Sequence, residues 1–248
     1  MASISETGHA INVTNFETLI TAVTAYGSSY NPSKDSIKLP ALQSILTAAK
    51  ESLNAINIAQ PAYSNAVAAR ESAFEPFSRL ITRVNNALKA SDTTVQVDES
   101  AQTIVRKLQG RRASAKISDE EKQALEAEGK EVNQISAAQM SYDSRLENFD
   151  RLIMLLSSVP LYNPNEEDLK ITSLTTYYNL LREKNTDVLV PTIQLSNARI
   201  SRNEILYKTL TGLIDIATDT KTYIKSIFGA TSPQYKQISK LKFIKPRL

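Results

Sequence analysis

The apolar residues of this chain recur at alternating four- and three-residue spacings, which is the pattern of amphipathic helices. From residue 40 to residue 90 this spacing continues without a break and predicts one long helix packed in coiled-coil fashion. Shorter helices are predicted before it, at residues 14–26, and after it, at residues 99–109. Because only six glycines interrupt the whole chain, we expect an all-α fold.

The second half of the chain repeats the landmarks of the first half in the same order. Three short motifs recur at a nearly constant offset: Asn15-Phe16 and Asn148-Phe149, Tyr30-Asn31-Pro32 and Tyr162-Asn163-Pro164, and Ser64-Asn65-Ala66 and Ser196-Asn197-Ala198. The shared order and spacing indicate two tandem repeats, residues 1–109 and 135–248. The charge-rich stretch at residues 110–134 lacks an apolar stripe, so we expect a flexible linker there.

Each repeat is expected to contain a short helix, a long kinked helix and a second short helix. The short helices of the second repeat are predicted at residues 137–158 and 232–241. Pro61 and Pro191 fall near the middle of the long helices, where proline removes a backbone hydrogen bond and either kinks the helix or splits it into a hairpin; we favour the kink. The short helices are too short to cover the whole apolar seam of a long helix. We therefore expect each end of the molecule to be a helical bundle that contains helices of both repeats. We therefore predict an elongated pseudo-twofold helical bundle in which the repeats form one intertwined domain.

A candidate interaction waist lies where the two long helices are expected to cross, near Asn65 and Asn197. The residues around both positions are small, and the two asparagines are expected to hydrogen-bond across the crossing as a buried seam asparagine does. Arg70 and Arg202 flank this point on the apolar seams of the two helices. Such arginines bind an anion or a carboxylate of a partner, or pair internally with a nearby acid, and we favour internal pairing.

Residues suited to catalysis or metal binding are scarce. The chain has no cysteine, which excludes disulfides, thiolate nucleophiles and sulfur-ligated zinc. Its single histidine, His9, is expected in an N-terminal loop without a structural or catalytic role. Asp143, Glu147 and Asp150 share one helix face by their spacing, and we expect that face to be solvated. We therefore predict that the protein is not an enzyme and has no catalytic, cofactor-binding or metal-binding residues.

The charge and the ends of the chain bear on its location and partners. The formal net charge of +3 does not by itself imply a nucleic-acid partner. The N-terminal residues lack the basic and apolar regions of a signal peptide, and no apolar stretch is long enough to span a bilayer. We expect a soluble cytoplasmic protein, with non-classical export left open. The basic segment at residues 235–245 is expected to dock as an ordinary helix, with contact to an acidic membrane or nucleic acid as the alternative.

At the repeated motifs, and at the run Phe228-Gly229-Ala230-Thr231-Ser232-Pro233-Gln234-Tyr235-Lys236, the sequence resembles a group of uncharacterised bacterial helical proteins of similar length. The resemblance covers most of the chain and implies a helical fold. No activity is assigned to that group, so the resemblance carries over no functional residues.

The favoured function is a non-enzymatic helical scaffold or protein-interaction module, with a protein partner or self-association. One alternative is a soluble component of an α-helical pore-forming or membrane-remodelling system, although the chain lacks a long apolar hairpin to insert. Another is weak nucleic-acid binding through the basic residues Arg106, Lys107, Arg111 and Arg112 and the C-terminal lysines.

Overall fold

The computed structural model describes residues 5–111 and 140–245. Within these ranges every regular element is an α-helix or a short 3-10 helix, and no strand occurs. The chain divides into a first unit, Met1–Ser64 with Val190–Leu248, and a second unit, Asn65–Leu189. Each unit therefore contains helices from both halves of the sequence. The all-α prediction is confirmed.

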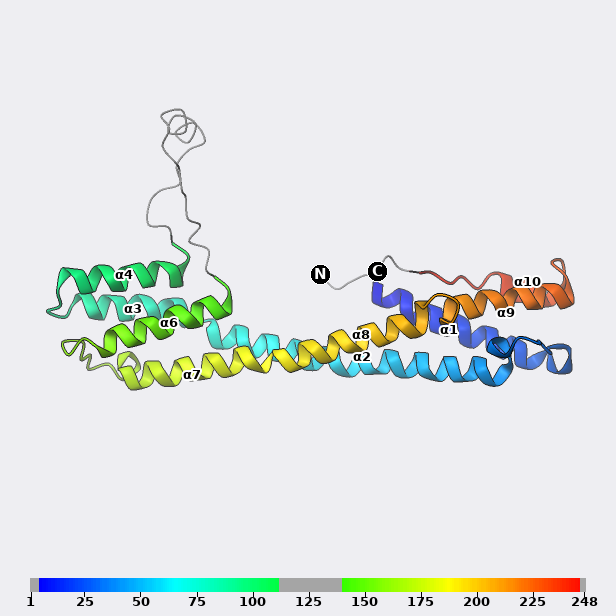
Figure 1. Cartoon of the computed structure of the whole chain (residues 1–248), viewed down its shortest axis with the longest axis horizontal. Coiled ribbons are helices and arrows are strands. Elements are labelled where there is room, and N and C mark those ends of the chain that lie inside the picture. The colour runs from blue at the N-terminus through cyan, green and yellow to red at the C-terminus, as the bar shows by residue number, and fades with distance from the viewer. Residues whose placement is uncertain (1–4, 112–139, 246–248) are drawn as a thin grey trace, which may run out of the picture. The chain divides into compact units, whose positions relative to one another are not determined.

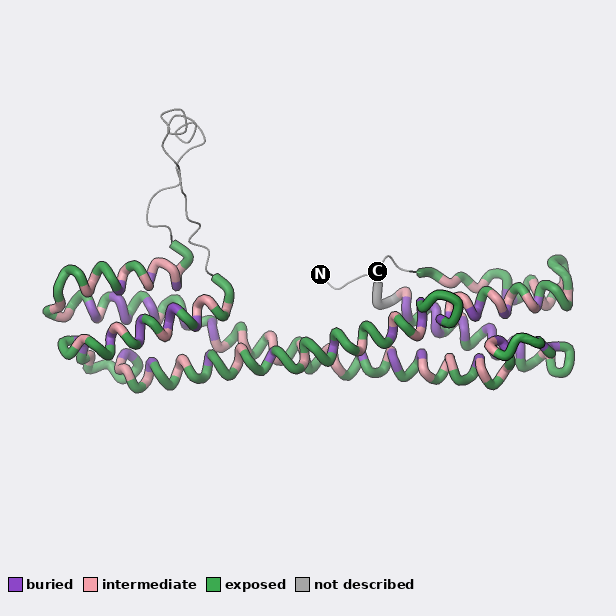
Figure 2. The backbone as a smooth tube through the Cα atoms, in the orientation of Figure 1, coloured by how far each residue is buried: buried purple, intermediate pink, exposed green. Residues whose placement is uncertain are grey.

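The first unit is built around α1 and α9. Helix α1 (Ser5–Ala25) packs against α9 (Leu213–Phe228), and α10 (Pro233–Ser239) packs against the same helix (Figure 1). The unit also contains most of α2 (Leu39–Phe74) and nearly all of α8 (Leu189–Tyr207). Its apolar core includes the fully buried side chains Phe16, Leu19, Leu42, Leu213 and Ile224. Figure 2 shows buried positions along the facing sides of these helices.

The second unit has its own core. Helix α6 (Tyr142–Ser157) packs against α7 (Ile171–Asp187) and against α4 (Val95–Gln109), and α4 also packs against α3 (Phe77–Lys89). The last turns of α2 complete this unit. The largest side chains of its core are fully buried: Phe77, Phe149, Ile81, Leu88, Leu108, Leu152, Leu156, Leu174 and Leu181.

One loop is built in the same way in both units. In the first unit the hydroxyl of Tyr30 donates a 2.6 Å hydrogen bond to the carbonyl oxygen of Ile37, at the end of the 3-10 turn Asp35–Ile37. In the second unit the hydroxyl of Tyr162 donates a 2.9 Å bond to the carbonyl of Leu169, at the end of Glu167–Leu169. Both tyrosines are buried, and burial raises the pKa of each to about 12. Each hydroxyl thus closes its loop.

The prediction of one unbroken helix from residue 40 to residue 90 is wrong at Pro76. Helix α2 continues through Pro61 without splitting, but it ends at Phe74, and α3 begins at Phe77 after a turn containing Pro76. Proline disfavours the α-conformation of the residue before it and supplies no N–H, so Pro76 ends α2.

The second long helix is divided at two places. Val188 alone separates the end of α7 at Asp187 from the start of α8 at Leu189, and a turn at residues 208–212 separates α8 from α9. Pro191 lies in the first turn of α8 and has no N–H to donate to the carbonyl of Asp187, so the kink expected at this proline takes the form of a one-residue break between α7 and α8. In the second break Leu210 has a φ of 70°, a left-handed conformation that helices do not contain.

Several predicted boundaries shift. Helix α1 begins at Ser5 rather than at residue 14, so His9 lies within a helix and not in a loop. Helix α4 begins at Val95 and ends before Gly110, which has a φ of 64° and terminates the helix. Most of the expected linker at residues 110–134, and the first residues of the helix expected at 137–158, lie outside the described residues.

Candidate functional site

The outward face of α8 carries a stripe of exposed apolar side chains. Val190, Ile193 and Ile200 have 63%, 60% and 56% of their surfaces exposed. With Asn197 between them they follow a three-four-three spacing, which is that of the a and d positions of a coiled coil. Leu195 lies on the opposite side of the helix and is buried in the unit. Helix α8 therefore presents one apolar side to its own core and another to solvent.

The side chains that flank this stripe are uncharged. In the same heptad register, the e positions are Gln194 and Ser201 and the g positions are Ser196 and Asn203. Charges at e and g positions select or reject a partner helix, and like charges repel an identical one. The flanks of the stripe therefore present no electrostatic barrier to a second copy of the same helix.

The four residues of the expected waist divide between the two units. Asn65 and Arg70 belong to the second unit, whereas Asn197 and Arg202 belong to the first. Asn65 and Asn197 are both exposed, which differs from the buried seam asparagines expected from the sequence. The crossing of the long helices at these asparagines stays a prediction.

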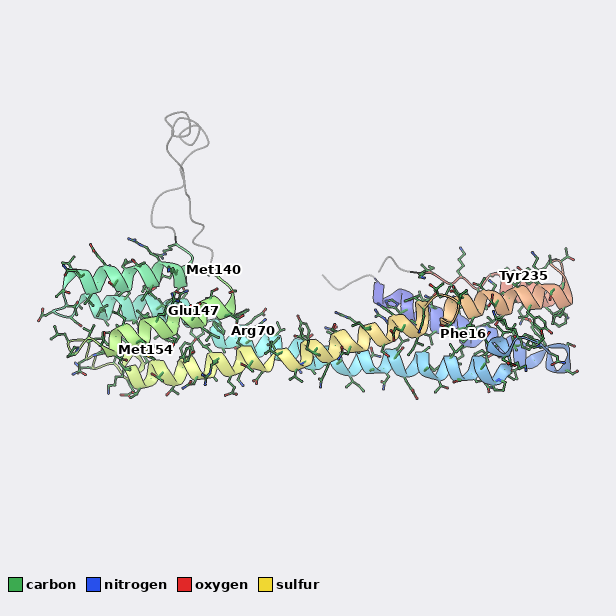
Figure 3. The ribbon with its side chains drawn as sticks, viewed as in Figure 1. Phe16, Arg70, Met140, Glu147, Met154 and Tyr235 are labelled. Carbon is green, nitrogen blue, oxygen red and sulfur yellow. The ribbon has the colours of Figure 1, made fainter. Side chains whose placement is uncertain are left out.

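Arg70 is half-buried at the end of α2 and lies beside the first turn of α6 (Figure 3). Its guanidinium lies 4.0 Å from the centre of the Tyr142 ring, a cation–π contact. Its Nη1 donates to the side-chain oxygen of Asn185 at 3.3 Å, and Asn185 donates in turn to Asp143 at 2.7 Å. Arg70 is thus linked to a carboxylate within its own unit through one amide, which is a form of internal pairing.

Arg202 is buried, with 4% of its surface exposed. Its Nε and Nη2 donate to the side-chain oxygen of Asn203 at 3.1 and 2.9 Å. This arginine faces the core side of α8, away from the exposed stripe. It is therefore placed to stabilise the unit rather than to meet a ligand at the outward face of the helix.

A third arginine, Arg145, was missed in the sequence. Its guanidinium lies 4.7 Å from the ring centre of Phe77 and 5.1 Å from that of Phe74. Burial lowers the pKa of Arg145, because the charged form loses contact with water. Nothing in its sequence neighbourhood distinguishes it from a solvated arginine, since the two rings come from distant residues.

His9 is part of a buried polar network, which corrects the expectation of an idle loop residue. His9 and Asn12, on one face of α1, have 1% and 0% of their surfaces exposed. Nδ1 of His9 hydrogen-bonds with the hydroxyl of Tyr207, and the side-chain amide of Asn12 donates to the same hydroxyl at 3.3 Å. The network ties α1 to the end of α8.

The helix predicted at residues 232–241 is present as α10, which packs against α9, but the basic segment at residues 235–245 docks as a helix only in its first part. Helix α10 ends at Ser239, and residues 241–245 form no helix. Instead this segment is held against α1: the side-chain amide of Asn12 donates to the carbonyl of Ile244 at 2.8 Å, and that of Asn15 to the carbonyl of Lys242 at 2.7 Å. The lysines of the segment are therefore presented from a docked chain.

The carboxylates noted in the sequence take part in separate contacts. Asp143 accepts from Asn185, and Glu147 forms a 2.5 Å ion pair with Arg151 one turn away. Across the described residues, no group of three or more histidine, aspartate or glutamate side chains is arranged to hold a metal ion.

Comparison with known protein families, with curated proteins and with solved structures gave no match for this chain. Among the described residues, no helix combines the length and the apolar character that crossing a membrane requires.

Proposed function

We propose that this protein is a non-enzymatic helical scaffold that associates through the outward face of α8, and that the partner there is the same helix of a second copy. The observation that supports the proposal is the exposed stripe of Val190, Ile193 and Ile200, opposite the buried side of the helix. Exposed apolar residues scattered singly are ordinary, but three in coiled-coil register form a surface that another helix can cover.

Asn197 supports an identical helix as the partner. An asparagine within an apolar seam needs a polar group opposite it once water is excluded, and a single such residue fixes register and oligomeric state. The same helix of a second copy brings its own Asn197 to this position. The uncharged flanks of the stripe do not oppose this pairing.

The stripe is short, so the association should be weak. From Val190 to Ile200 the helix advances about 15 Å at its rise per residue. A stable interface buries about 1,200–2,000 Å² in total, more than one stripe of this length provides. We therefore expect association that is reversible and visible only at high protein concentration.

Sedimentation velocity over a range of concentrations up to about 1 mM tests this proposal. The sedimentation coefficient of the wild-type chain should rise with concentration, and the double variant Ile193→Asp with Ile200→Asp should remain monomeric. Ile58→Asp is the matched control, because Ile58 lies on α2 and is exposed to 67%. A wild-type chain that stays monomeric throughout, or an equal effect of the Ile58 variant, would reject the α8 face as the site.

We also infer that the chain is two tandem repeats. The tyrosine-closed loops support this inference, because Tyr30 and Tyr162 occupy equivalent positions of the repeated Tyr-Asn-Pro motif and each bonds the carbonyl seven residues later. The core residues Phe16 and Phe149, which are equivalent in the repeated Asn-Phe motif, are both fully buried. A duplicated helical unit is consistent with a scaffold.

A further inference from the structure

Asn12 binds the backbone of the C-terminal segment as another strand would. Its side-chain Nδ2 donates to the carbonyl of Ile244 at 2.8 Å, and its Oδ1 accepts from the amide of the same residue at 2.9 Å. The second hydrogen of Nδ2 goes to the hydroxyl of Tyr207. Both the amide nitrogen and the oxygen of this fully buried side chain are therefore used.

Further side chains hold the same segment, and they too bind its backbone. Asn15, one helical turn after Asn12, donates to the carbonyl of Lys242 at 2.7 Å. Lys221 of α9 donates to the carbonyls of Ser239 and Leu241 at 3.2 and 3.0 Å. Lys221 is half-buried, and this partial burial lowers the pKa of its ammonium group. Backbone atoms are the same in every residue, so these hydrogen bonds fix the course of the backbone and do not depend on which side chains the segment carries.

Two apolar side chains of the segment add contacts that depend on its sequence. Leu241 and Phe243 are partly buried and pack against the core of the first unit. Lys242, between them, is exposed, and Ile244 is exposed to 59%. Alternation of covered and exposed side chains is the property of an extended chain, in which neighbours point to opposite sides.

We propose that Asn12, Asn15 and Lys221 form a binding site for an extended peptide whose alternate side chains are apolar, as Leu241 and Phe243 are, and that the site accepts residues 240–245 of a second copy in place of its own. This site is independent of the α8 face. The identical segment is the partner whose fit the structure supports, because its backbone and its two apolar side chains already match the site. Exchange of the segment would link copies of the protein.

Competition from the chain's own segment sets the conditions of the test. A tethered segment acts at an effective concentration in the millimolar range, so it keeps a free peptide out of the wild-type protein. Phe243→Ala weakens the tethered segment and leaves the site residues unchanged. The full-length Phe243→Ala chain should therefore bind an added peptide with the wild-type sequence of residues 240–245.

The probe is this peptide labelled with fluorescein, and the readout is fluorescence anisotropy. The Phe243→Ala chain should bind the peptide at least about tenfold more tightly than the wild-type chain does. Adding Asn15→Ala, which removes one hydrogen bond from a half-buried position, should weaken binding about fivefold, and adding Asn12→Ala should weaken it more. Adding Asn54→Ala, at an exposed asparagine of α2, should change nothing.

Two outcomes would overturn the proposal. The first is a Phe243→Ala chain that retains its helical circular dichroism but binds the peptide no better than the wild-type chain. The second is binding that Asn15→Ala and Asn54→Ala affect equally, since the peptide would then be held elsewhere. Asn15→Ala keeps the test decisive even if the buried Asn12→Ala variant fails to fold.

Discussion

Replacing Tyr30 or Tyr162 by phenylalanine removes one hydroxyl from each tyrosine-closed loop and leaves the ring in place. A buried hydrogen bond contributes about 1 kcal/mol net, and a buried carbonyl left without a donor adds a cost of about 1–3 kcal/mol. Ile37 and Leu169 are themselves buried, so each carbonyl would lose its tyrosine donor away from water. We therefore expect each variant to lose about 1–3 kcal/mol of unfolding free energy.

Urea denaturation followed by far-ultraviolet circular dichroism measures this loss. Tyr63→Phe serves as the control, because Tyr63 lies in α2 and its hydroxyl makes no hydrogen bond within the described part of the chain. Its free energy of unfolding should stay within about 0.5 kcal/mol of the wild-type value. The Tyr30→Phe and Tyr162→Phe losses should add in the double variant, since the two loops belong to different units.

The reasoning fails if either loop variant is as stable as Tyr63→Phe, because the hydroxyls would then contribute nothing to loop closure. It also fails if one loop variant loses stability and the other does not. In that case the two loops would share a sequence motif without sharing an energetic role.

Other consequences concern pH, truncation and the second core. Burial raises the pKa of Tyr30 and Tyr162 from 10.0 to about 12, so the folded state favours their protonated hydroxyls. Their contribution to the free energy of unfolding is therefore complete below pH 10 and is lost as the pH rises through 12. Tyrosinate absorbance and circular dichroism should change together over this range. Residues 1–110 expressed alone should be poorly folded or self-paired, because each unit needs helices from both halves; a stable monomer in sedimentation and circular dichroism would contradict this. Phe149→Ala should cost about 3–5 kcal/mol in urea denaturation, as expected for a fully buried phenylalanine.

Helical periodicity predicted the core-facing residues of the short helices well. Phe16 and Leu19 of α1, and Phe149 and Leu152 of α6, lie three residues apart, which places each pair on one helix face, and all four are fully buried. The reason is physical: burial requires an apolar face, and a helix that packs by one face must repeat its apolar residues every three or four positions. Existence and orientation of these helices therefore follow from local sequence.

The ends of the long helices could not be predicted from the same pattern. Phe74 and Phe77 continue the apolar seam and are both buried, yet they lie on two different helices. Two helices that pack around one core can present the same spacing as a single continuous helix. The local signal of the break is Pro76, at the junction. Proline disfavours the α-conformation of the residue before it, which ends a helix even where the apolar spacing continues.

The candidate sites were hidden for two different reasons. Ile193 and Ile200 of α8 lie away from Leu195, whose side of the helix is buried, so a single apolar periodicity does not assign them a role. The contacts of Asn12 depend on Tyr207 and Ile244, which are 195 and 232 residues away in sequence. Hydrogen bonds between residues so far apart leave no periodic signal in the sequence. A single polar residue on an apolar helix face, such as Asn12, looks only like a break in the apolar pattern.

The proposed duplication indicates where the two units have diverged. When Asn15 is aligned with Asn148, Asn12 aligns with Arg145. Asn12 binds the backbone of the C-terminal segment, whereas Arg145 stacks against phenylalanine rings. A planar guanidinium has donors but no acceptor, so it cannot accept from a peptide N–H as the amide oxygen of Asn12 does. The peptide site should therefore be confined to the first unit, and a chain that exchanges its C-terminal segment would engage one site for each copy.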